Sequence, residues 1–427
     1  MLPLLLCFGF LVMFFGQVAL VGGLQPSLLV SEDKQKLPAG NQTVTASSSW
    51  STLGAGVYRT EEGKPWILPV VKEAVKLLSA DPAVNFEYVP MLGLEAFTTA
   101  ATRLLLGADS PALRDGRAFG VQGIAGTGSL RIAADFLATV VPNLTKVAYI
   151  SRPGWDNHRL LFTRAGFTEI REYRYWHAAE CALDIAGMLE DLGGAPERSV
   201  VIFHACAHNP TGVDPTHDQW REILKVVKQR SLFPVFDVAY QGFASGDPDI
   251  DAWPVRLFVS EGVELLACQS FAKNFGLYNQ RLGNIVIVTA NPETVHPIRS
   301  QLAIIIRGTF TSPPAYGAQI VARILSDPQL TVQWKADLNT MSTRLMEMRQ
   351  QLRTRLETKN TPGSWRHLTE QRGMFAFTGL NERQCEYLKT QWHIALLKSG
   401  RISLSGLSMQ NVERVSQAFY DAVTTIV

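Results

Sequence analysis

Apolar, strand-like runs that end in polar residues recur along the middle of this chain, and they constrain its fold more than any other feature. The four clearest runs cover residues 147–151, 200–205, 233–237 and 263–270. Helical patterns separate some of them, for example residues 219–230. Strands that alternate with helices predict a mostly parallel α/β sheet. Ligands of such sheets bind outside the carboxyl ends of the strands, so a site is expected there.

Length and composition predict an ordinary globular protein with two lobes. The chain has 427 residues, of which 46% are hydrophobic and 18% charged, and domains average about 150 residues. The net charge of +2 and the lack of a dense basic tract argue against nucleic-acid binding. Helical patterns dominate after residue 307, and the part after about residue 340 is predicted to form most of a smaller lobe.

The N-terminal segment leaves several alternatives open. Residues 1–25 carry no charged side chain and are long enough to cross a bilayer, although a signal peptide would normally begin with Lys or Arg. They form a signal peptide, an uncleaved anchor or an artefact of gene modelling. Residues 26–50 are polar and predict a linker. Asn41 and Asn143 begin glycosylation sequons, which matter only if the chain enters the secretory route.

The five cysteines show neither metal-ligand nor disulfide spacing. Cys206 and Cys268 lie in apolar runs and are predicted to be buried free thiols. This pattern favours a reducing compartment.

A single lysine, Lys273, lies in a loop of small and polar residues between the strand-like runs 263–268 and 284–290. An amine is nucleophilic only when part of it is deprotonated, and burial or a cationic neighbour such as Arg281 lowers its pKa. The loop alone leaves open whether Lys273 is catalytic or an ordinary loop lysine.

Other polar and glycine-rich segments complete a candidate site. The stretch 120–128 is predicted to be a glycine-rich loop that leads into a helix at residues 129–140, an arrangement that suits a phosphate. The residues that follow the strands are Trp155, Asn209, Asp237, Tyr240, Ser270 and Lys273. Pyridoxal phosphate requires four things of a protein: a lysine to form an imine, a carboxylate for its ring nitrogen, an aromatic ring to stack on it and a binding site for its phosphate.

These residues stand in motifs that resemble a known family. Residues 52–427 resemble the class I pyridoxal-phosphate-dependent aminotransferases, and within them the cytosolic type of aspartate aminotransferase. The segment from Ser270 to Gly283 resembles the family's lysine signature. Further matches follow the family's order at residues 87–94, 204–212, 236–245 and 399–402.

The resemblance implies a role for each cofactor-binding residue. Lys273 would be the Schiff-base lysine and proton shuttle, and Asp237 would pair with the ring nitrogen. Trp155 would stack on the ring. Tyr240 and Asn209 would contact the ring oxygen. The residues that would hold the phosphate are Gly126, Thr127, Ser270 and Arg281, with Tyr88 from the neighbouring subunit.

It also implies a substrate site shared by two subunits of a homodimer. Arg401 would bind the substrate α-carboxylate, helped by Asn209, Trp155 and the backbone of Gly56. Arg307 of the other subunit would bind the distal carboxylate, because the planar fork of arginine matches a carboxylate. The run from Arg307 to Ser312 departs from the family's usual Arg-Ile-Thr-Trp-Ser-Asn.

The expected fold is therefore fold type I of the pyridoxal-phosphate enzymes, with a mostly parallel seven-stranded sheet in a large domain (64–340) and a smaller α+β domain (51–63 and 341–427). The expected reaction is ping-pong amino transfer between L-aspartate and 2-oxoglutarate in the cytoplasm, without a metal. Two alternatives are an aminotransferase for aromatic or sulfinate amino acids and a catalytically silent, membrane-tethered relative. Membrane anchoring or secretion would depend on residues 1–25.

Overall fold

The computed structural model describes residues 51–426, which belong to one compact unit. The predictions for residues 1–25 and 26–50 lie outside the described residues. Within residues 51–426, no helix is both long and apolar enough to span a membrane.

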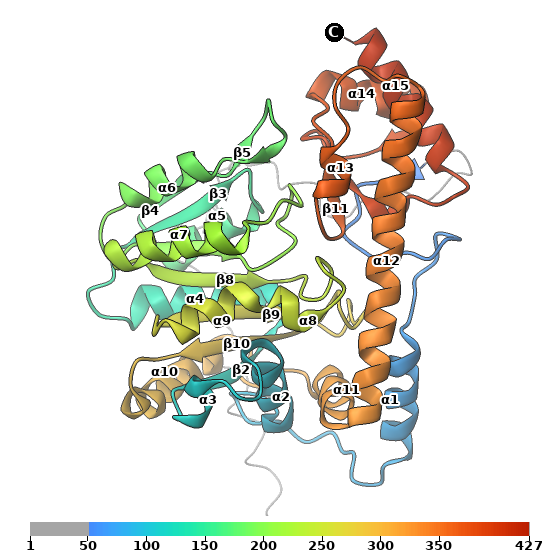
Figure 1. The fold of residues 1–427 in the computed structure, drawn as a ribbon. Coiled ribbons are helices and arrows are strands. Elements are labelled where there is room, and N and C mark those ends of the chain that lie inside the picture. The colour runs from blue at the N-terminus through green and yellow to red at the C-terminus, as the bar shows by residue number, and fades with distance from the viewer. Residues whose placement is uncertain (1–50, 427) are drawn as a thin grey trace, which may run out of the picture. The chain divides into compact units, whose positions relative to one another are not determined.

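A seven-stranded sheet is the centre of this unit (Figure 1). Its strands are β2 (Ala118–Ile124), β10 (Leu282–Val288), β9 (Leu265–Ser270), β8 (Phe233–Val238), β7 (Val200–His204), β3 (Val147–Arg152) and β4 (Glu169–Arg174), in spatial order. β10 is antiparallel to both of its neighbours, whereas the other pairs are parallel, so six strands share one direction. The predicted mostly parallel seven-stranded sheet is confirmed.

Helices cover both faces of the sheet. One face packs against α4 (Ala125–Thr139), α5 (Asn157–Ala165) and α10 (Val295–Arg307), and the other against α2 (Glu95–Leu106), α6 (Ile185–Gly193), α7 (His217–Gln229) and α9 (Trp253–Ser260). In β7, Val201 and Phe203 enter one core, and Val200 and Ile202 enter the other. A strand buried on both faces is a continuous apolar run, and each such side chain stabilises the fold by about 1.5–3 kcal/mol.

The predicted glycine-rich loop at residues 120–128 is wrong. β2 continues to Ile124 and α4 begins at Ala125, so strand and helix meet without a loop. Ala125 takes a positive φ of 58° and donates its N–H to the carbonyl oxygen of Arg281 at 2.8 Å. A Cβ on Gly123 would lie 2.3 Å from the hydroxyl oxygen of Ser129. The glycines therefore allow close packing of helix on strand.

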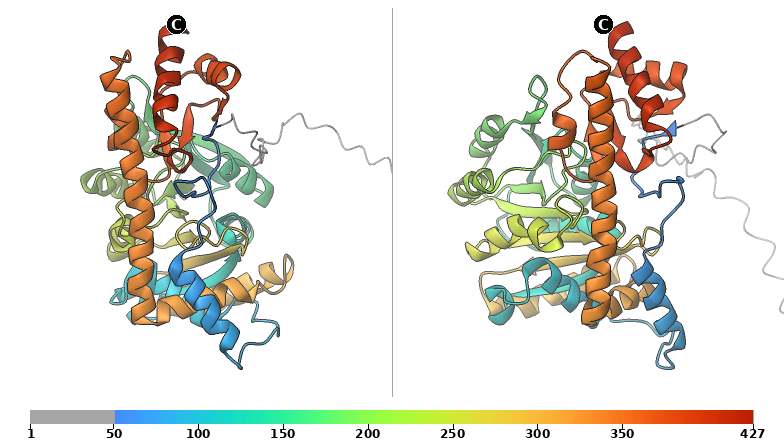
Figure 2. Two further views of the ribbon diagram at one scale, coloured as in Figure 1. Left: turned by 90° about the vertical axis from the view of Figure 1, so that its right-hand side faces the viewer. Right: turned by 45° about the vertical axis from the view of Figure 1, so that its right-hand side comes forward.

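The long helix α12 (Pro328–Thr358) contacts α1 (Pro69–Ala80) and α11 (Ala315–Ser326) near one end and α13 (His367–Glu370) and α15 (Val412–Thr425) towards the other (Figures 1 and 2). Asp327 caps it by accepting from the backbone N–H groups of Gln329 and Leu330. The proposed division into large and small domains remains a prediction.

Short strands and helices complete the described chain. β11 (Phe375–Phe377) pairs antiparallel with β13 (Arg401–Ser403), and β1 (Ser51–Thr52) pairs parallel with β12 (Ile394–Ala395). The others are α3 (Pro111–Arg114), β5 (Trp176–His177), β6 (Ala182–Leu183), α8 (Pro248–Asp251), η1 (Pro292–Thr294), α14 (Glu382–Trp392) and η2 (Leu404–Gly406). Cys206 and Cys268 are buried free thiols, as predicted.

Candidate active site

The carboxyl ends of four neighbouring parallel strands, β9, β8, β7 and β3, bring the predicted site residues to one edge of the sheet. Asp237 is the penultimate residue of β8, Ser270 ends β9, and Lys273 follows three residues later. Asn209 lies in the loop after β7, and Trp155 lies between β3 and α5. Residues separated by more than a hundred positions therefore meet because parallel strands end at the same edge.

Lys273 is held above an aromatic ring in a largely buried position. Its Nζ lies 5.0 Å from the centroid of the Tyr240 ring. Burial lowers the pKa of Lys273, the carboxylate of Asp237 opposes that change, and the charge of Arg281 adds to it. A lowered pKa increases the fraction of free amine at neutral pH, which is the form that acts as a nucleophile or base.

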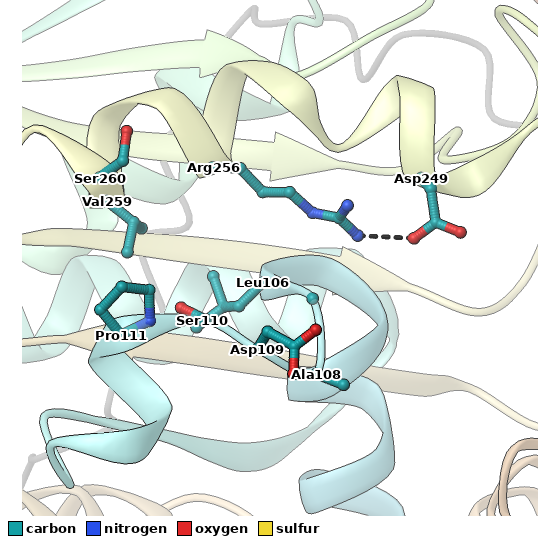
Figure 3. Close-up of a pocket in the computed structure, with 10 residues that line it drawn as sticks. Leu106, Ala108, Asp109, Ser110, Pro111, Asp249, Arg256, Val259 and Ser260 are labelled. Carbon is teal, nitrogen blue, oxygen red and sulfur yellow. Dashed lines mark hydrogen bonds and ion pairs between the residues drawn. The ribbon is translucent and has the colours of Figure 1, made fainter.

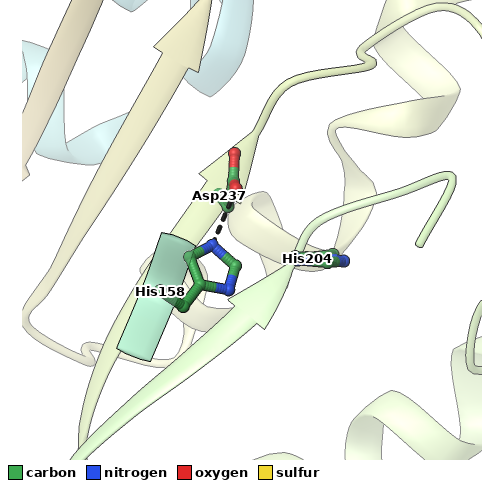
Figure 4. A group of neighbouring side chains, drawn as sticks. All are labelled: His158, His204 and Asp237. Carbon is green, nitrogen blue, oxygen red and sulfur yellow. Dashed lines mark hydrogen bonds and ion pairs between the residues drawn. The ribbon is translucent and has the colours of Figure 1, made fainter. Parts of the chain in front are cut away.

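Asp237 is paired with a histidine (Figure 4). Nε2 of His158 lies 2.9 Å from Oδ2 of Asp237, and both side chains are buried. Burial raises the pKa of Asp237, but the hydrogen bond from His158 and nearby positive charge, including that of Lys273, outweigh it and lower the pKa overall. The carboxyl group is therefore ionised at neutral pH, as a partner for a protonated ring nitrogen must be.

A second histidine, His204, lies beside this pair. Its Nδ1 accepts from the backbone N–H of Asn209 at 3.0 Å, and burial lowers its pKa to about 3, so the ring is neutral with its proton on Nε2. That Nε2 has no partner among residues 51–426. Ligand atoms of His158, His204 and Asp237 lie within 4.8 Å of one another, a spacing that could also hold a metal ion. The direct bond between His158 and Asp237 already uses one potential nitrogen ligand and one oxygen ligand.

The roles of the histidines were missed by sequence reasoning, although His204 and His208 lie in a matched motif. His208 bonds Thr211 through Nδ1 and Ser151 through Nε2, and its ring stacks on Tyr175 at 3.7 Å. One signal was available for His158, which lies only three residues after Trp155, at the start of α5. The two rings meet edge to face at 5.3 Å.

Arg401 is positioned as an anion clamp. Its Nη1 donates to Oδ1 of Asn209 at 3.0 Å and its Nη2 to the carbonyl oxygen of Gly54 at 2.9 Å. The guanidinium carbon lies 4.0 Å from the centroid of the Phe375 ring. The Nε atom is buried and makes no hydrogen bond within residues 51–426. A guanidinium held in place by Asn209 and Gly54, with a charged donor still unpaired among the described residues, is suited to an anionic ligand.

The predicted phosphate-binding residues lie around the start of α4. Gly126 and Thr127 are in the first turn of this fifteen-residue helix, where free N–H groups favour an anion. A Cβ on Gly126 would lie 3.1 Å from the Cβ of Ser270, so the helix start abuts the end of β9. Arg281 is exposed, and its Nη1 donates to the carbonyl oxygen of Tyr278 at 3.0 Å.

The structure does not bring Tyr88 and Arg307 into this group within one chain. Tyr88 is 91% exposed and Arg307 is exposed at the end of α10. No hydrogen bond or ring contact within residues 51–426 joins them to Lys273. The segments that carry them are fastened together, because the hydroxyl of Ser312 donates to the carbonyl oxygen of Val89 at 2.8 Å. Their action in a partner subunit remains a prediction.

A pocket of about 450 Å³ lies elsewhere, between the end of α2 and helices α8 and α9 (Figure 3). Its main polar lining groups, Arg256 and Asp249, pair with each other at 2.7 Å. The pocket does not include Lys273, Asp237 or Arg401, so we do not assign the chemistry to it.

The side chains present fit pyridoxal phosphate by their chemistry. The site offers an ionised, buried Asp237, the largely buried amine of Lys273, a helix start and two buried donors without partners in the described part of the chain, Nε of Arg401 and Nε2 of His204. Pyridoxal phosphate suits three of these groups: its basic ring nitrogen suits Asp237, its aldehyde suits the amine of Lys273, and its phosphate suits the helix start.

Comparison with known proteins identifies the family. A family model described as "Aminotransferase class I and II" matches residues 48–419. The chain belongs to the class I and II aminotransferases.

Curated proteins that are similar to this chain include several named "Aspartate aminotransferase, cytoplasmic". The protein of Gallus gallus is 52% identical over 377 residues, covering 88% of this chain and 92% of the relative. The protein of Caenorhabditis elegans is 48% identical over 374 residues, covering 88% and 91%.

Solved structures of aminotransferases are also similar to this chain. The aspartate aminotransferase from Saccharomyces cerevisiae cytoplasm is 42% identical with a TM-score of 0.86, covering 89% of this chain and 93% of that one. An aromatic-amino-acid aminotransferase from Burkholderia pseudomallei, covalently bound to pyridoxal phosphate, is 37% identical with a TM-score of 0.85, covering 88% and 94%.

Proposed function

We propose that this chain is an aspartate aminotransferase, which exchanges an amino group between L-aspartate and 2-oxoglutarate to give oxaloacetate and L-glutamate. The observation that carries the proposal is the partly buried guanidinium of Arg401, whose buried Nε lacks a partner within the described residues, in a group that includes Lys273 and Asp237. The names of the Gallus gallus and Caenorhabditis elegans relatives support aspartate as the substrate.

The proposed cofactor is pyridoxal 5'-phosphate, which when bound supplies an aldehyde for the amino group and a protonated ring that withdraws electrons. Lys273 would be its point of attachment, and Asp237 would hold the proton on the ring nitrogen. Trp155 would stack on the ring, and Tyr240 and Asn209 would bond its oxygen. The phosphate would be held by Gly126, Thr127, Ser270 and Arg281, with Tyr88 of a second subunit.

The chain's own residues would then bind the substrate and move a proton. Arg401 binds the α-carboxylate through a planar fork that Asn209 and the Gly54 carbonyl hold in place. Lys273, with its lowered pKa, takes the proton from the substrate Cα and returns it at the other end of the reacting system. Asp237 stays ionised throughout, because His158 keeps its hydrogen bond to it.

A homodimer with shared sites is part of the proposal. The exposed Tyr88 and Arg307 would each act in the partner's site, with Arg307 on the distal carboxylate. The relatives named cytoplasmic favour the cytoplasm as the place of action.

The test is direct. Purified protein mixed with pyridoxal phosphate should show a visible absorption band that changes when L-aspartate is added, and aspartate with 2-oxoglutarate should yield oxaloacetate. A protein that takes up no pyridoxal phosphate would refute both cofactor and reaction.

A second candidate keeps the cofactor and changes the substrate to aromatic amino acids. It is favoured by the similarity to the Burkholderia pseudomallei enzyme and by the altered run after Arg307. A panel of amino acids assayed on the wild type and on Arg307→Ala separates the two. Under the leading proposal Arg307→Ala loses aspartate turnover by about 10- to 100-fold, the value of a charge-assisted hydrogen bond, and keeps activity towards aromatic substrates. Unchanged aspartate turnover would favour the second candidate.

A further inference from the structure

Arg349 is a buried charge to which the proposed reaction gives no task. It lies in the middle of α12 and is 2% exposed. No acidic side chain forms an ion pair with it within residues 51–426. Burying an ammonium or guanidinium without a counter-charge is costly, so its contacts should explain its presence.

Those contacts are backbone carbonyls of one segment. Nη1 donates to the carbonyl oxygen of Leu368 at 2.9 Å, and Nη2 donates to the carbonyl oxygens of Gly373, at 2.9 Å, and Phe375. A planar fork can bridge several carbonyls at once, which a lysine cannot. Arg349 therefore fixes the path of the chain into β11.

The same segment is fixed from two other sides. The side chain of Gln371, fully buried, bonds both the N–H and the carbonyl oxygen of Phe377 at 2.9 Å. Gly373 has a φ of 79°, and a Cβ there would lie 2.4 Å from the Cβ of Ala207 in the loop after β7. Residues 371–377 are thus held between α12 and the loop that carries Asn209.

The ring of Phe375 touches three of the proposed site residues. The guanidinium of Arg401 lies 4.0 Å above it, the Tyr240 ring meets it at 5.7 Å nearly at right angles, and a Cβ on Gly56 would lie 3.4 Å from its Cζ. A cation over an aromatic face is stabilised most where water is excluded. Phe375 is 3% exposed, so its ring forms a dry platform under the clamp.

We propose that Arg349 is a positioning residue for the α-carboxylate clamp: it sets the place of Phe375, and the Phe375 ring in turn sets the place of the Arg401 guanidinium. This inference rests on the proposed function, in which Arg401 binds the substrate carboxylate. Neither Arg349 nor Phe375 touches the reacting atoms in this account. Their effect should therefore appear in carboxylate binding.

The experiment compares Phe375→Leu, Arg349→Lys and the double variant as holoenzymes. The readouts are KM and kcat for L-aspartate and, independently of turnover, the Kd of succinate by calorimetry. Phe375→Leu should raise KM and Kd about tenfold while kcat changes little, since a desolvated cation–π contact is lost. Arg349→Lys should also raise the KM for aspartate and the Kd for succinate. Because both act along one path, the double variant should be no worse than Phe375→Leu alone.

A matched control separates positioning from folding. Phe419→Leu makes the same change in a fully buried ring of α15, which packs on Trp365. It should lower the unfolding temperature and leave KM and Kd unchanged. If Phe375→Leu and Arg349→Lys likewise lower only the unfolding temperature, the inference is overturned.

The succinate measurement distinguishes the two proposals. A wild type that turns over aspartate, with variants of unchanged KM and Kd, overturns the positioning role alone. A wild type that binds succinate without turning over aspartate refutes the proposed function, and the variants' succinate Kd still decides the positioning role. A wild type that neither binds succinate nor turns over aspartate overturns both the proposed function and the positioning role.

Discussion

Replacing His158 by leucine tests how Asp237 is kept ionised. The bond between His158 Nε2 and Asp237 Oδ2 is 2.9 Å long, and the two side chains are 1% and 8% exposed, so solvent screens it little. A hydrogen bond to a charged group contributes about 1.5–3 kcal/mol, and leaving a buried carboxylate without it has a similar cost. The variant should therefore lose about 2–3 kcal/mol of unfolding free energy at pH 8.

The pH dependence of the unfolding free energy gives a sharper test of this explanation. In the wild type the pKa of Asp237 is lowered by folding, so its contribution is present above the carboxyl's unfolded pKa, about 3.9, and is lost only as pH falls through the folded pKa. In His158→Leu, burial dominates and raises the folded pKa. Protonation of Asp237 then removes the cost of its buried charge. The difference in unfolding free energy between wild type and variant should therefore shrink as pH falls from 8 to 5.

Urea unfolding of the cofactor-free protein across this pH range measures the effect. His158→Gln keeps an N–H donor and should recover most of the lost stability. In an Asp237→Asn background, His158→Leu should cost less than about 1 kcal/mol, since no charge remains to be satisfied. A loss that is equal at pH 8 and pH 5 would contradict the electrostatic explanation and leave packing as its cause.

Three further predictions concern other parts of the site and its frame. Lys273→Ala should lower aspartate turnover by about 10⁴-fold with an unchanged circular dichroism spectrum, since the proton shuttle is lost. Arg401→Lys should raise KM for aspartate about 10- to 100-fold in initial-rate assays, because an ammonium cannot replace the planar fork. Gly93→Ala should lose about 2–5 kcal/mol in urea unfolding, because φ is 100° and the new Cβ would lie 2.2 Å from the Cβ of Gln122. Gly63→Ala, with φ of 71° and nothing within 4 Å, is its control and should lose only about 1–2 kcal/mol.

Most of the sheet could be predicted from the sequence, because a strand buried on both faces is apolar along its whole length. The runs at residues 147–151, 200–205 and 233–237 match β3, β7 and β8 within one residue at each end. The direction of β10 could not be predicted, since its apolar pattern does not depend on direction. The stretch 120–128 was misjudged because its glycines permit close packing as well as turns. The residues that folding brings against them, such as Thr102 beside Gly120 and Ser129 beside Gly123, decide between the two.

The amino-acid sequence by itself determined which chemical groups are available and where along the chain they occur: the lone lysine after β9, the acid at the end of β8 and the arginine in the motif at residues 399–402. Only the tertiary structure decided how these groups behave. The pKa of Lys273 depends on burial and on Asp237, and the clamp of Arg401 depends on Asn209, Gly54 and Phe375. Such effects arise between residues distant in sequence, and electrostatic strength varies with the burial that folding creates.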